Sequence, residues 1–161
     1  MPKVIVVYDS VTGNTEAMAK AVVEGAKEVR NVEVEMFKVG TQFPMGVLAS
    51  ADAIIVGSPT EYGNATMQMR GFLTSMVELV QAKKLKLKGL PGGVFGSYEW
   101  DGGWGTEMLA NKIGAAGLRL IPPVVSAPGK LGMGLPNELR LNECRELGRA
   151  VAGKAAGRKK K

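Results

Sequence analysis

Short apolar runs alternate with longer amphipathic segments along the chain. The runs at 3–8, 53–57 and 92–97 are continuous and apolar, as expected of strands buried on both faces of a sheet. The segment 32–37 alternates apolar and acidic residues, which indicates an edge or half-covered strand. A further strand is predicted over 118–126. Pro122 and Pro123 place it at or near an edge, because neither residue can donate to a strand ladder.

Helical periodicity predicts helices over about 14–30, 66–80, 105–117 and 137–156, with a loose stretch from 40 to 50. The first helix gathers Met18, Val22 and Val29 on one face. Strands that alternate with helices form parallel sheets with both faces covered. The sequence therefore predicts an α/β fold, a doubly wound five-stranded parallel sheet with helices on both faces.

The length of 161 residues predicts one domain over 1–156, followed by a basic, disordered tail at 157–161. The formal net charge is +6, and Arg158 with the three final lysines carries four of these charges. A solvated terminus explains the tail better than contact with nucleic acid or a membrane. With a single cysteine, no apolar run long enough to span a membrane and no leader-like start, we expect a cytoplasmic protein.

The composition excludes many kinds of catalytic site. The chain has no histidine and only one cysteine, Cys144, which we expect to be a core residue of the last helix. Ser-His-Asp triads and zinc or iron–sulfur sites are therefore ruled out, and no metal site is expected. Chemistry beyond that of carboxylates, hydroxyls and amines requires a bound cofactor.

The loop after the first strand is suited to a phosphate group. Its residues are Ser10, Val11, Thr12, Gly13, Asn14 and Thr15, and a helix follows at once. Amides at a helix N-terminus and hydroxyl donors both bind anions. Simple N-capping needs one hydroxyl, whereas this loop has three, so phosphate binding is favoured. The loop has no lysine, and the nearest Gly-x-Gly, at 103–105, lacks the third glycine, so neither a nucleotide P-loop nor a dinucleotide fingerprint is indicated.

Two more loops lie after the runs that end near Gly57 and Gly96 and share the same sheet edge. The first, starting at Ser58, contains Pro59, Thr60, Glu61, Tyr62, Gly63 and Asn64. An aromatic residue beside glycine suits ring stacking next to a peptide that can change conformation, although an ordinary turn is an alternative. The second contains Ser97, Tyr98, Glu99, Trp100, Gly102 and Gly103. Aromatics in a glycine-rich loop indicate a flat aromatic ligand.

Taken together, the three loops resemble those of flavodoxins. Residues 10–15 match the family's FMN phosphate loop, Tyr62-Gly63-Asn64 stands where the family has an aromatic-Gly-acidic turn, and Tyr98 and Trp100 stand where it places aromatics against the isoalloxazine. Residues 96–103 and 146–149 are also similar to the flavodoxin domain of flavodiiron oxidases. Residues 58–64 and 68–70 resemble flavodoxin-like NAD(P)H:quinone oxidoreductases, which place a histidine near the flavin that this chain lacks.

The resemblance implies a one-electron carrier with non-covalent FMN and no catalytic residue of its own, acting through the low-potential semiquinone/hydroquinone couple. In the family the peptide at the position of Gly63 flips on reduction and its carbonyl accepts a hydrogen bond from flavin N5. Glu61, Glu99 and Asp101 would lower the second potential and could dock a basic redox partner. We expect redox protein partners, no nucleic acid or membrane partner, and a monomer or weak dimer. An FMN-dependent NAD(P)H:quinone oxidoreductase and a cofactor-free interaction module are the alternatives.

Overall fold

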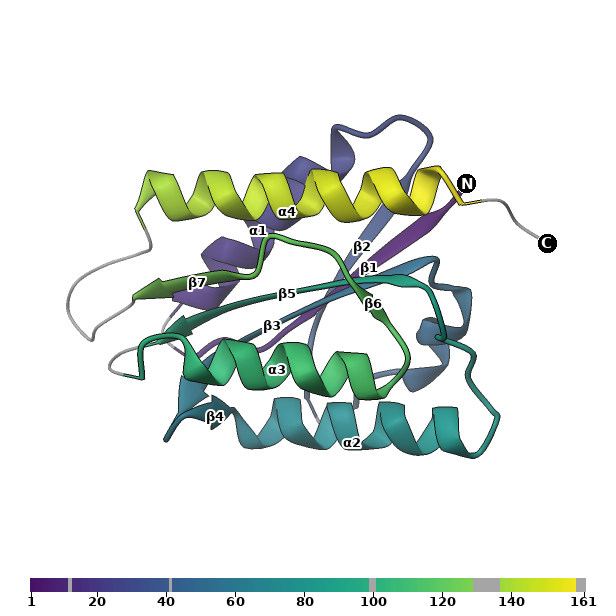
Figure 1. Ribbon diagram of the computed structural model, residues 1–161, viewed down its shortest axis with the longest axis horizontal. Coiled ribbons are helices and arrows are strands. Elements are labelled where there is room, and N and C mark those ends of the chain that lie inside the picture. Colours follow the sequence, from purple (N-terminus) through teal and green to yellow (C-terminus); the bar gives the residue numbers. More distant parts are fainter. Residues whose placement is uncertain (12, 41, 99–100, 129–136, 159–161) are drawn as a thin grey trace.

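The sheet is parallel and follows the order β2-β1-β3-β5, with β6 and β7 both beside β5 (Figure 1). The computed structural model describes residues 1–11, 13–40, 42–98, 101–128 and 137–158. Its strands are β1 (Lys3–Tyr8), β2 (Glu33–Lys38), β3 (Ala53–Glu61), β4 (Asn64–Ala65), β5 (Pro91–Tyr98), β6 (Arg119–Leu120) and β7 (Val125–Pro128). Its helices are α1 (Asn14–Lys27), the 3-10 helix η1 (Met45–Ser50), α2 (Met67–Gln81), α3 (Trp104–Ala115) and α4 (Glu138–Ala156).

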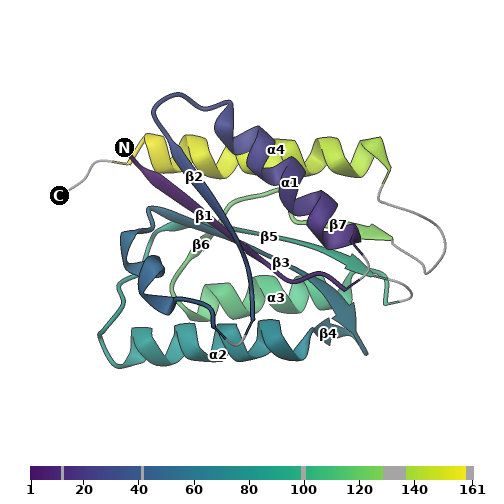
Figure 2. The same ribbon diagram turned by 180° about the vertical axis from the view of Figure 1, so that it is seen from behind.

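Helices cover both faces of the sheet, as the sequence predicted. Helices α1 and α4 lie on one face, and α2 and α3 lie on the other (Figures 1 and 2). Successive residues of a strand point to opposite faces. Val4 and Val6 accordingly pack toward α1 and α4, while Ile5 and Val7 belong to the core beneath α2 and α3. This alternation explains why β1 is continuously apolar after Lys3: from Val4 onward both faces of the strand are buried.

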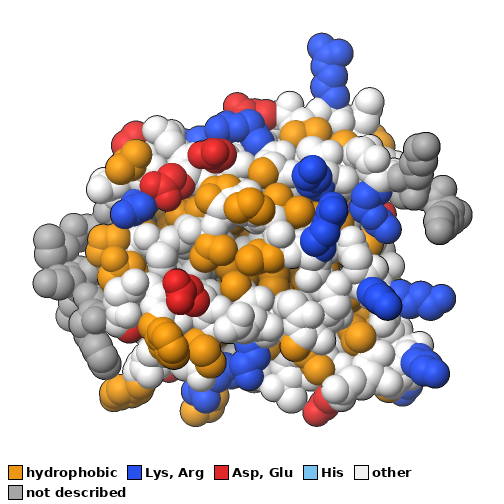
Figure 3. All heavy atoms as spheres, in the orientation of Figure 1, with side chains coloured by type: hydrophobic (Ala, Val, Ile, Leu, Met, Phe, Trp, Pro, Cys, Tyr) orange, Lys and Arg blue, Asp and Glu red, His pale blue; other side chains and the backbone are white. Residues whose placement is uncertain are grey.

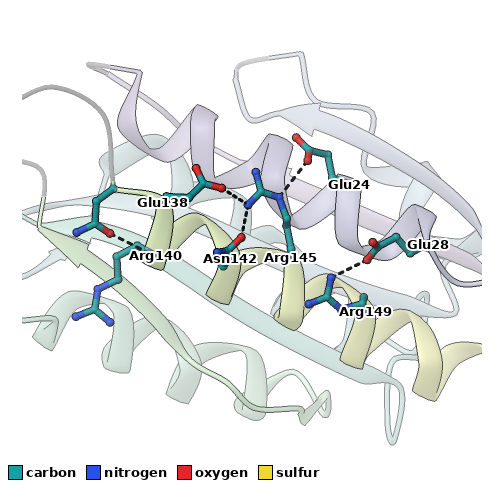
Figure 4. A network of polar contacts seen from close by, with 8 residues as sticks. Glu24, Glu28, Glu138, Arg140, Asn142, Arg145 and Arg149 are labelled. Atoms are coloured by element: carbon teal, nitrogen blue, oxygen red, sulfur yellow. Dashed lines mark hydrogen bonds and ion pairs between the residues drawn. The ribbon is translucent and has the colours of Figure 1, made fainter.

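Helices α1 and α4 approach each other very closely, and glycine permits this. A Cβ atom on Gly148 of α4 would lie 2.0 Å from the Val22 carbonyl oxygen, and one on Gly25 of α1 would lie 1.9 Å from that of Arg145. Ion pairs flank the crossing (Figure 4): Arg145 contacts Glu24 at 3.1 Å, and Arg149 contacts Glu28 at 2.7 Å. The two helices thus form one packed layer on their face of the sheet.

Two predicted segments have different strand boundaries in the structure. The strand expected over 118–126 is divided into β6 and β7, with the cis peptide Pro122–Pro123 between them. Both pieces pair with β5 in parallel and lie at the sheet edge. The prolines have no N–H to offer a ladder, which accounts for the break. The loop expected after Gly57 instead continues β3 as far as Glu61, because Ser58 and Pro59 pair with β5.

Two segments outside the predicted helices and strands contain buried residues. The loose stretch contains η1, whose Leu48 is buried. In the lysine-rich linker at 83–88, which joins α2 to β5, Leu85 and Leu87 are buried while the lysines between and around them are exposed. Arg158 lies 3.8 Å from Asp52, and residues 159–161, where the predicted tail ends, are outside the described part of the chain. Among the described residues, no helix has the length and apolar character needed to cross a bilayer.

Candidate functional site

The carboxyl ends of β1, β3 and β5 bring the three sequence-predicted loops to one edge of the sheet. Strand β1 pairs with β2 on one side and with β3 on the other. The chain therefore leaves β1 in one direction and returns on the opposite side, which makes the β1/β3 boundary a topological switch point. Open α/β sheets bind ligands in the crevice at such a point, and the flavodoxin order is among the examples from which this rule is drawn.

The loop after β1 leads directly into the N-terminus of α1. Gly13 has a left-handed backbone (φ 96°) and occupies the N-cap, where it has no side chain of its own to cap the helix. The Ser10 hydroxyl oxygen accepts hydrogen bonds from the amides of Gly13 (3.2 Å) and Glu16 (3.3 Å). A hydroxyl has two acceptor positions and one donor, so the Ser10 O–H stays available to donate. This loop therefore offers both a hydroxyl donor and a helix N-terminus to an anion.

Hydroxyl contacts fasten this loop to its surroundings. Thr15 Oγ1 and Ser97 Oγ are 2.9 Å apart and buried, and they join the first turn of α1 to the end of β5. The Tyr8 hydroxyl donates to Glu16 at 3.3 Å. Burial, followed by the nearby Glu16 carboxylate, raises the pKa of Tyr8, so its hydroxyl stays protonated at neutral pH.

The second loop is a tight hairpin. Strand β3 turns into β4 with Glu61 paired to Asn64, so that Tyr62 and Gly63 alone form the connection. Both have positive φ, 51° and 78°, as a type I′ hairpin turn requires. Tyr62 is 95% exposed, so its ring packs into no core and is free to contact a ligand. The turn expected around Tyr62-Gly63 is therefore present, although its flanks are strands.

The start of α3, which directly follows the third loop, packs against the hairpin. A Cβ atom on Gly105 would lie 2.2 Å from Thr60 Cγ2, and one on Gly63 would lie 3.5 Å from Trp104 Cδ1. Gly102 and Gly103 both have positive φ, and the Gly103 amide donates to Asp101 Oδ1 at 2.8 Å. The other oxygen, Asp101 Oδ2, is buried and has no hydrogen-bond partner among the described residues. A buried carboxylate oxygen is costly unless it is paired, so this atom is suited to a ligand N–H.

Most of the predicted site residues fall within the described chain and gather at this edge. Three of them, Thr12, Glu99 and Trp100, lie outside the described residues. Asp9 and Thr66 are not among the site residues predicted from the sequence, although Thr66 Oγ1 donates to Asp9 Oδ2 at 2.5 Å inside the site. A threonine just before an apolar helix is a recognisable N-cap, but nothing in the sequence indicates that its hydroxyl reaches a carboxylate 57 positions earlier.

Comparison with known proteins supports the same fold. The family model described as flavodoxin matches residues 6–146. A solved archaeal flavodoxin shares 34% identity at a TM-score of 0.81, over 96% of this chain and 99% of that one.

Two curated relatives are enzymes by name. The NAD(P)H dehydrogenase (quinone) of Methanosarcina barkeri is 38% identical over 44% of this chain and 47% of its own length. The nitric oxide reductase of Moorella thermoacetica is 31% identical over 96% of this chain and 36% of its own length. The chain thus spans less than half the length of either. The matched family model, the strand order and the three loops at the switch point lead to one conclusion: the chain belongs to the flavodoxin family.

Proposed function

We propose that this protein is a flavodoxin in the functional sense, a carrier that transfers electrons one at a time by means of non-covalently bound FMN. The observation that carries the proposal is the loop after β1, where the Ser10 hydroxyl lies at the start of α1 and the two together would suit an anion. Bound FMN would supply the reversible acceptor of electrons, and the chain itself supplies binding and control.

The residues present fit FMN. The loop at 10–15 suits its terminal phosphate, and the exposed Tyr62 suits one face of a flat aromatic ring. Asp101 Oδ2 is buried without a partner in the described chain, and a ring N–H would satisfy it. Gly63 follows Tyr62 in the turn, and glycine tolerates both signs of φ, so the peptide there can reorient without strain.

Acidic side chains would control the electron affinity of the site. Glu61 is exposed beside the turn and Asp101 lies in the third loop. Negative charges close to the ring oppose the addition of a further electron, which keeps the second potential low. The same charges would attract a basic surface on a redox protein partner. We further propose a cytoplasmic protein that acts as a monomer or weak dimer.

A second candidate function is that of an FMN-dependent NAD(P)H:quinone oxidoreductase. Its support is the similarity to the NAD(P)H dehydrogenase (quinone) of Methanosarcina barkeri, together with the exposed Tyr62, which leaves the hairpin side of the site open to a second substrate. Such an enzyme would transfer a hydride in one step, and would need room for nicotinamide or quinone beside the flavin.

An anaerobic reductive titration of the FMN-loaded protein separates the two functions. A long-wavelength absorbance band that rises and then falls is expected for the one-electron carrier. Direct bleaching without this band, together with rapid oxidation of NAD(P)H by a soluble quinone, would establish the reductase instead. Failure of the apo protein to take up FMN would contradict both functions.

A further inference from the structure

A buried carboxylate connects two of the three loops. Asp9 follows β1 and is 6% exposed. Its Oδ1 accepts the Ser10 amide at 2.8 Å, at the beginning of the phosphate loop. Its Oδ2 accepts the Thr66 hydroxyl at 2.5 Å, at the beginning of α2. One side chain thus makes a hydrogen bond to each side of the switch point.

Thr66 carries this connection to the base of the hairpin. Its Oγ1 accepts the Met69 amide at 3.2 Å and so caps α2. Its own amide donates to Ser58 Oγ at 3.2 Å, and the Ser58 hydroxyl donates to the Pro59 carbonyl at 2.8 Å. Thr66 and Ser58 are buried. Thr66 also follows directly on Ala65, which pairs with Thr60 in the hairpin. Buried hydrogen bonds therefore run from the phosphate loop to both strands of the hairpin.

The identity of Asp9 is unexpected for a residue that only fills space beside an anion site. A carboxylate at this position repels a bound phosphate group, whereas a neutral side chain would not. A carboxylate, however, accepts on both of its oxygens, which the amide of asparagine cannot do. The carboxylate is explained if the hydrogen bonds that Asp9 accepts from the Ser10 amide and the Thr66 hydroxyl are both needed at the same time.

We propose that Asp9 couples occupancy of the phosphate loop to the conformation of the 61–64 hairpin, through Thr66. Asp9 is a positioning residue that makes the phosphate group of FMN favour the hairpin geometry that receives the ring. The protein then discriminates FMN from riboflavin by more than the direct phosphate contacts. This inference rests on the proposed FMN function. The coupling means that the phosphate group binds with different affinity to two arrangements of the hairpin.

The first test uses inorganic phosphate and the apo protein, so that no flavin is involved. Amide NMR signals of the ¹⁵N-labelled protein are followed during a phosphate titration. In the wild type, saturable shifts are expected for Gly13–Glu16 and also for Thr66–Met69. Thr66→Val removes the hydroxyl and should retain the first set of shifts while losing the second. Thr66→Ser should restore both.

A matched control separates coupling from the loss of a helix cap. Asn137 caps α4 by accepting the Arg140 amide at 3.0 Å, and no hydrogen bond of the described residues links it to Asp9. Asn137→Ala therefore removes a helix N-cap of the same kind, and this variant should still show both sets of NMR shifts. Circular dichroism checks that each variant is folded.

The second test compares the dissociation constants of FMN and riboflavin. The preference for FMN should fall by about fivefold or more in Thr66→Val and stay at the wild-type level in Thr66→Ser and Asn137→Ala. An unchanged preference in Thr66→Val would overturn the coupling. Wild-type shifts confined to Gly13–Glu16 would overturn it while leaving the phosphate site intact. Absence of any shift, with no uptake of FMN, would overturn the proposed function as well.

Discussion

Tyr62 has a backbone conformation that tyrosine disfavours, since its φ is 51°. A left-handed residue other than glycine, asparagine or aspartate costs about 1 kcal/mol or more. Its side chain is almost wholly exposed and gains nothing from the core. The strain is explained if the tyrosine ring contacts a ligand rather than the core, and the flavin ring of the proposed FMN would be such a ligand.

Tyr62→Asn should change stability and binding in opposite directions. Asparagine tolerates positive φ, so the free energy of unfolding of the apo protein should rise by about 0.5–1 kcal/mol. The loss of ring stacking should weaken FMN binding by about tenfold. Urea unfolding and flavin fluorescence titration measure the two effects. Tyr62→Phe keeps the ring and the strain, and should match the wild type in both. A Tyr62→Asn protein that is less stable than the wild type would contradict this account.

Cys144 should make the stability of the fold depend on alkaline pH. Burial, and then the neighbouring Glu143, raises the pKa of its thiol from 9.0 to about 12. Because the folded pKa is the higher one, the stabilising contribution is complete below pH 9 and is lost as the pH rises from 9 toward 12. The free energy of unfolding should fall by up to about 1.4 kcal/mol per pH unit in this range on account of this group.

The comparison with Cys144→Ala isolates the thiol contribution. The variant loses some packing at every pH, but its free energy of unfolding should decline less steeply between pH 8 and pH 10.5. Tyr8, whose pKa is also raised, is present in both proteins, so its contribution cancels. Urea unfolding at several pH values measures the slopes. Equal slopes in the two proteins would show that the thiol is not desolvated as the structure indicates.

At the scale of elements, the crossing of α1 and α4 tests how far glycine determines the packing. Gly148→Ala would place a methyl group 2.0 Å from the Val22 carbonyl oxygen, so the helices must separate. We expect a loss of about 3 kcal/mol in the free energy of unfolding, measured by urea unfolding. The flanking ion pairs of Arg145 and Arg149 are partly exposed and contribute little that could compensate.

Gly153 offers a matched control in the same helix. It is exposed, and a Cβ atom there would have no neighbour within 4 Å. Gly153→Ala gains the same helix propensity without the clash, and should stabilise the protein by about 0.5–1 kcal/mol. If both variants changed stability equally, propensity rather than close packing would determine the effect.

The elements also show where sequence patterns suffice. Continuous apolar runs identified β1, β3 and β5, and helical periodicity located α1 to α4, because these segments bury continuous faces. The extension of β3 to Glu61 was missed, since Pro59 and Glu61 look like turn residues and their pairing with β5 and β4 is a tertiary property. The bond between Asp9 and Thr66 was missed for the same reason: it joins two loops that only the folded sheet brings together.

For the whole molecule, the distribution of charge matters more than the net value of +6. Exposed cations gather at the end opposite the candidate site, where the C terminus lies (Figure 3). Among them are Lys84, Lys86 and Lys88 in the linker before β5, and no carboxylate of the described residues forms an ion pair with them. Near the site stand Glu61 and Asp101 instead. Because salt screens charges beyond about 10 Å at 0.1 M, a reaction at the site depends mainly on the nearby acids.

The salt dependence of electron transfer distinguishes local from net charge. If Glu61 and Asp101 dominate, reduced protein should react faster with a small cationic acceptor than with an anionic one, and added salt should slow the cationic reaction. Glu61→Gln should flatten that slope, whereas Lys86→Gln at the far end should leave it unchanged. Stopped-flow oxidation at increasing ionic strength gives both slopes. If salt instead slowed the reaction with the anionic acceptor, the overall positive charge would control the encounter, and a basic partner would no longer be the expected one.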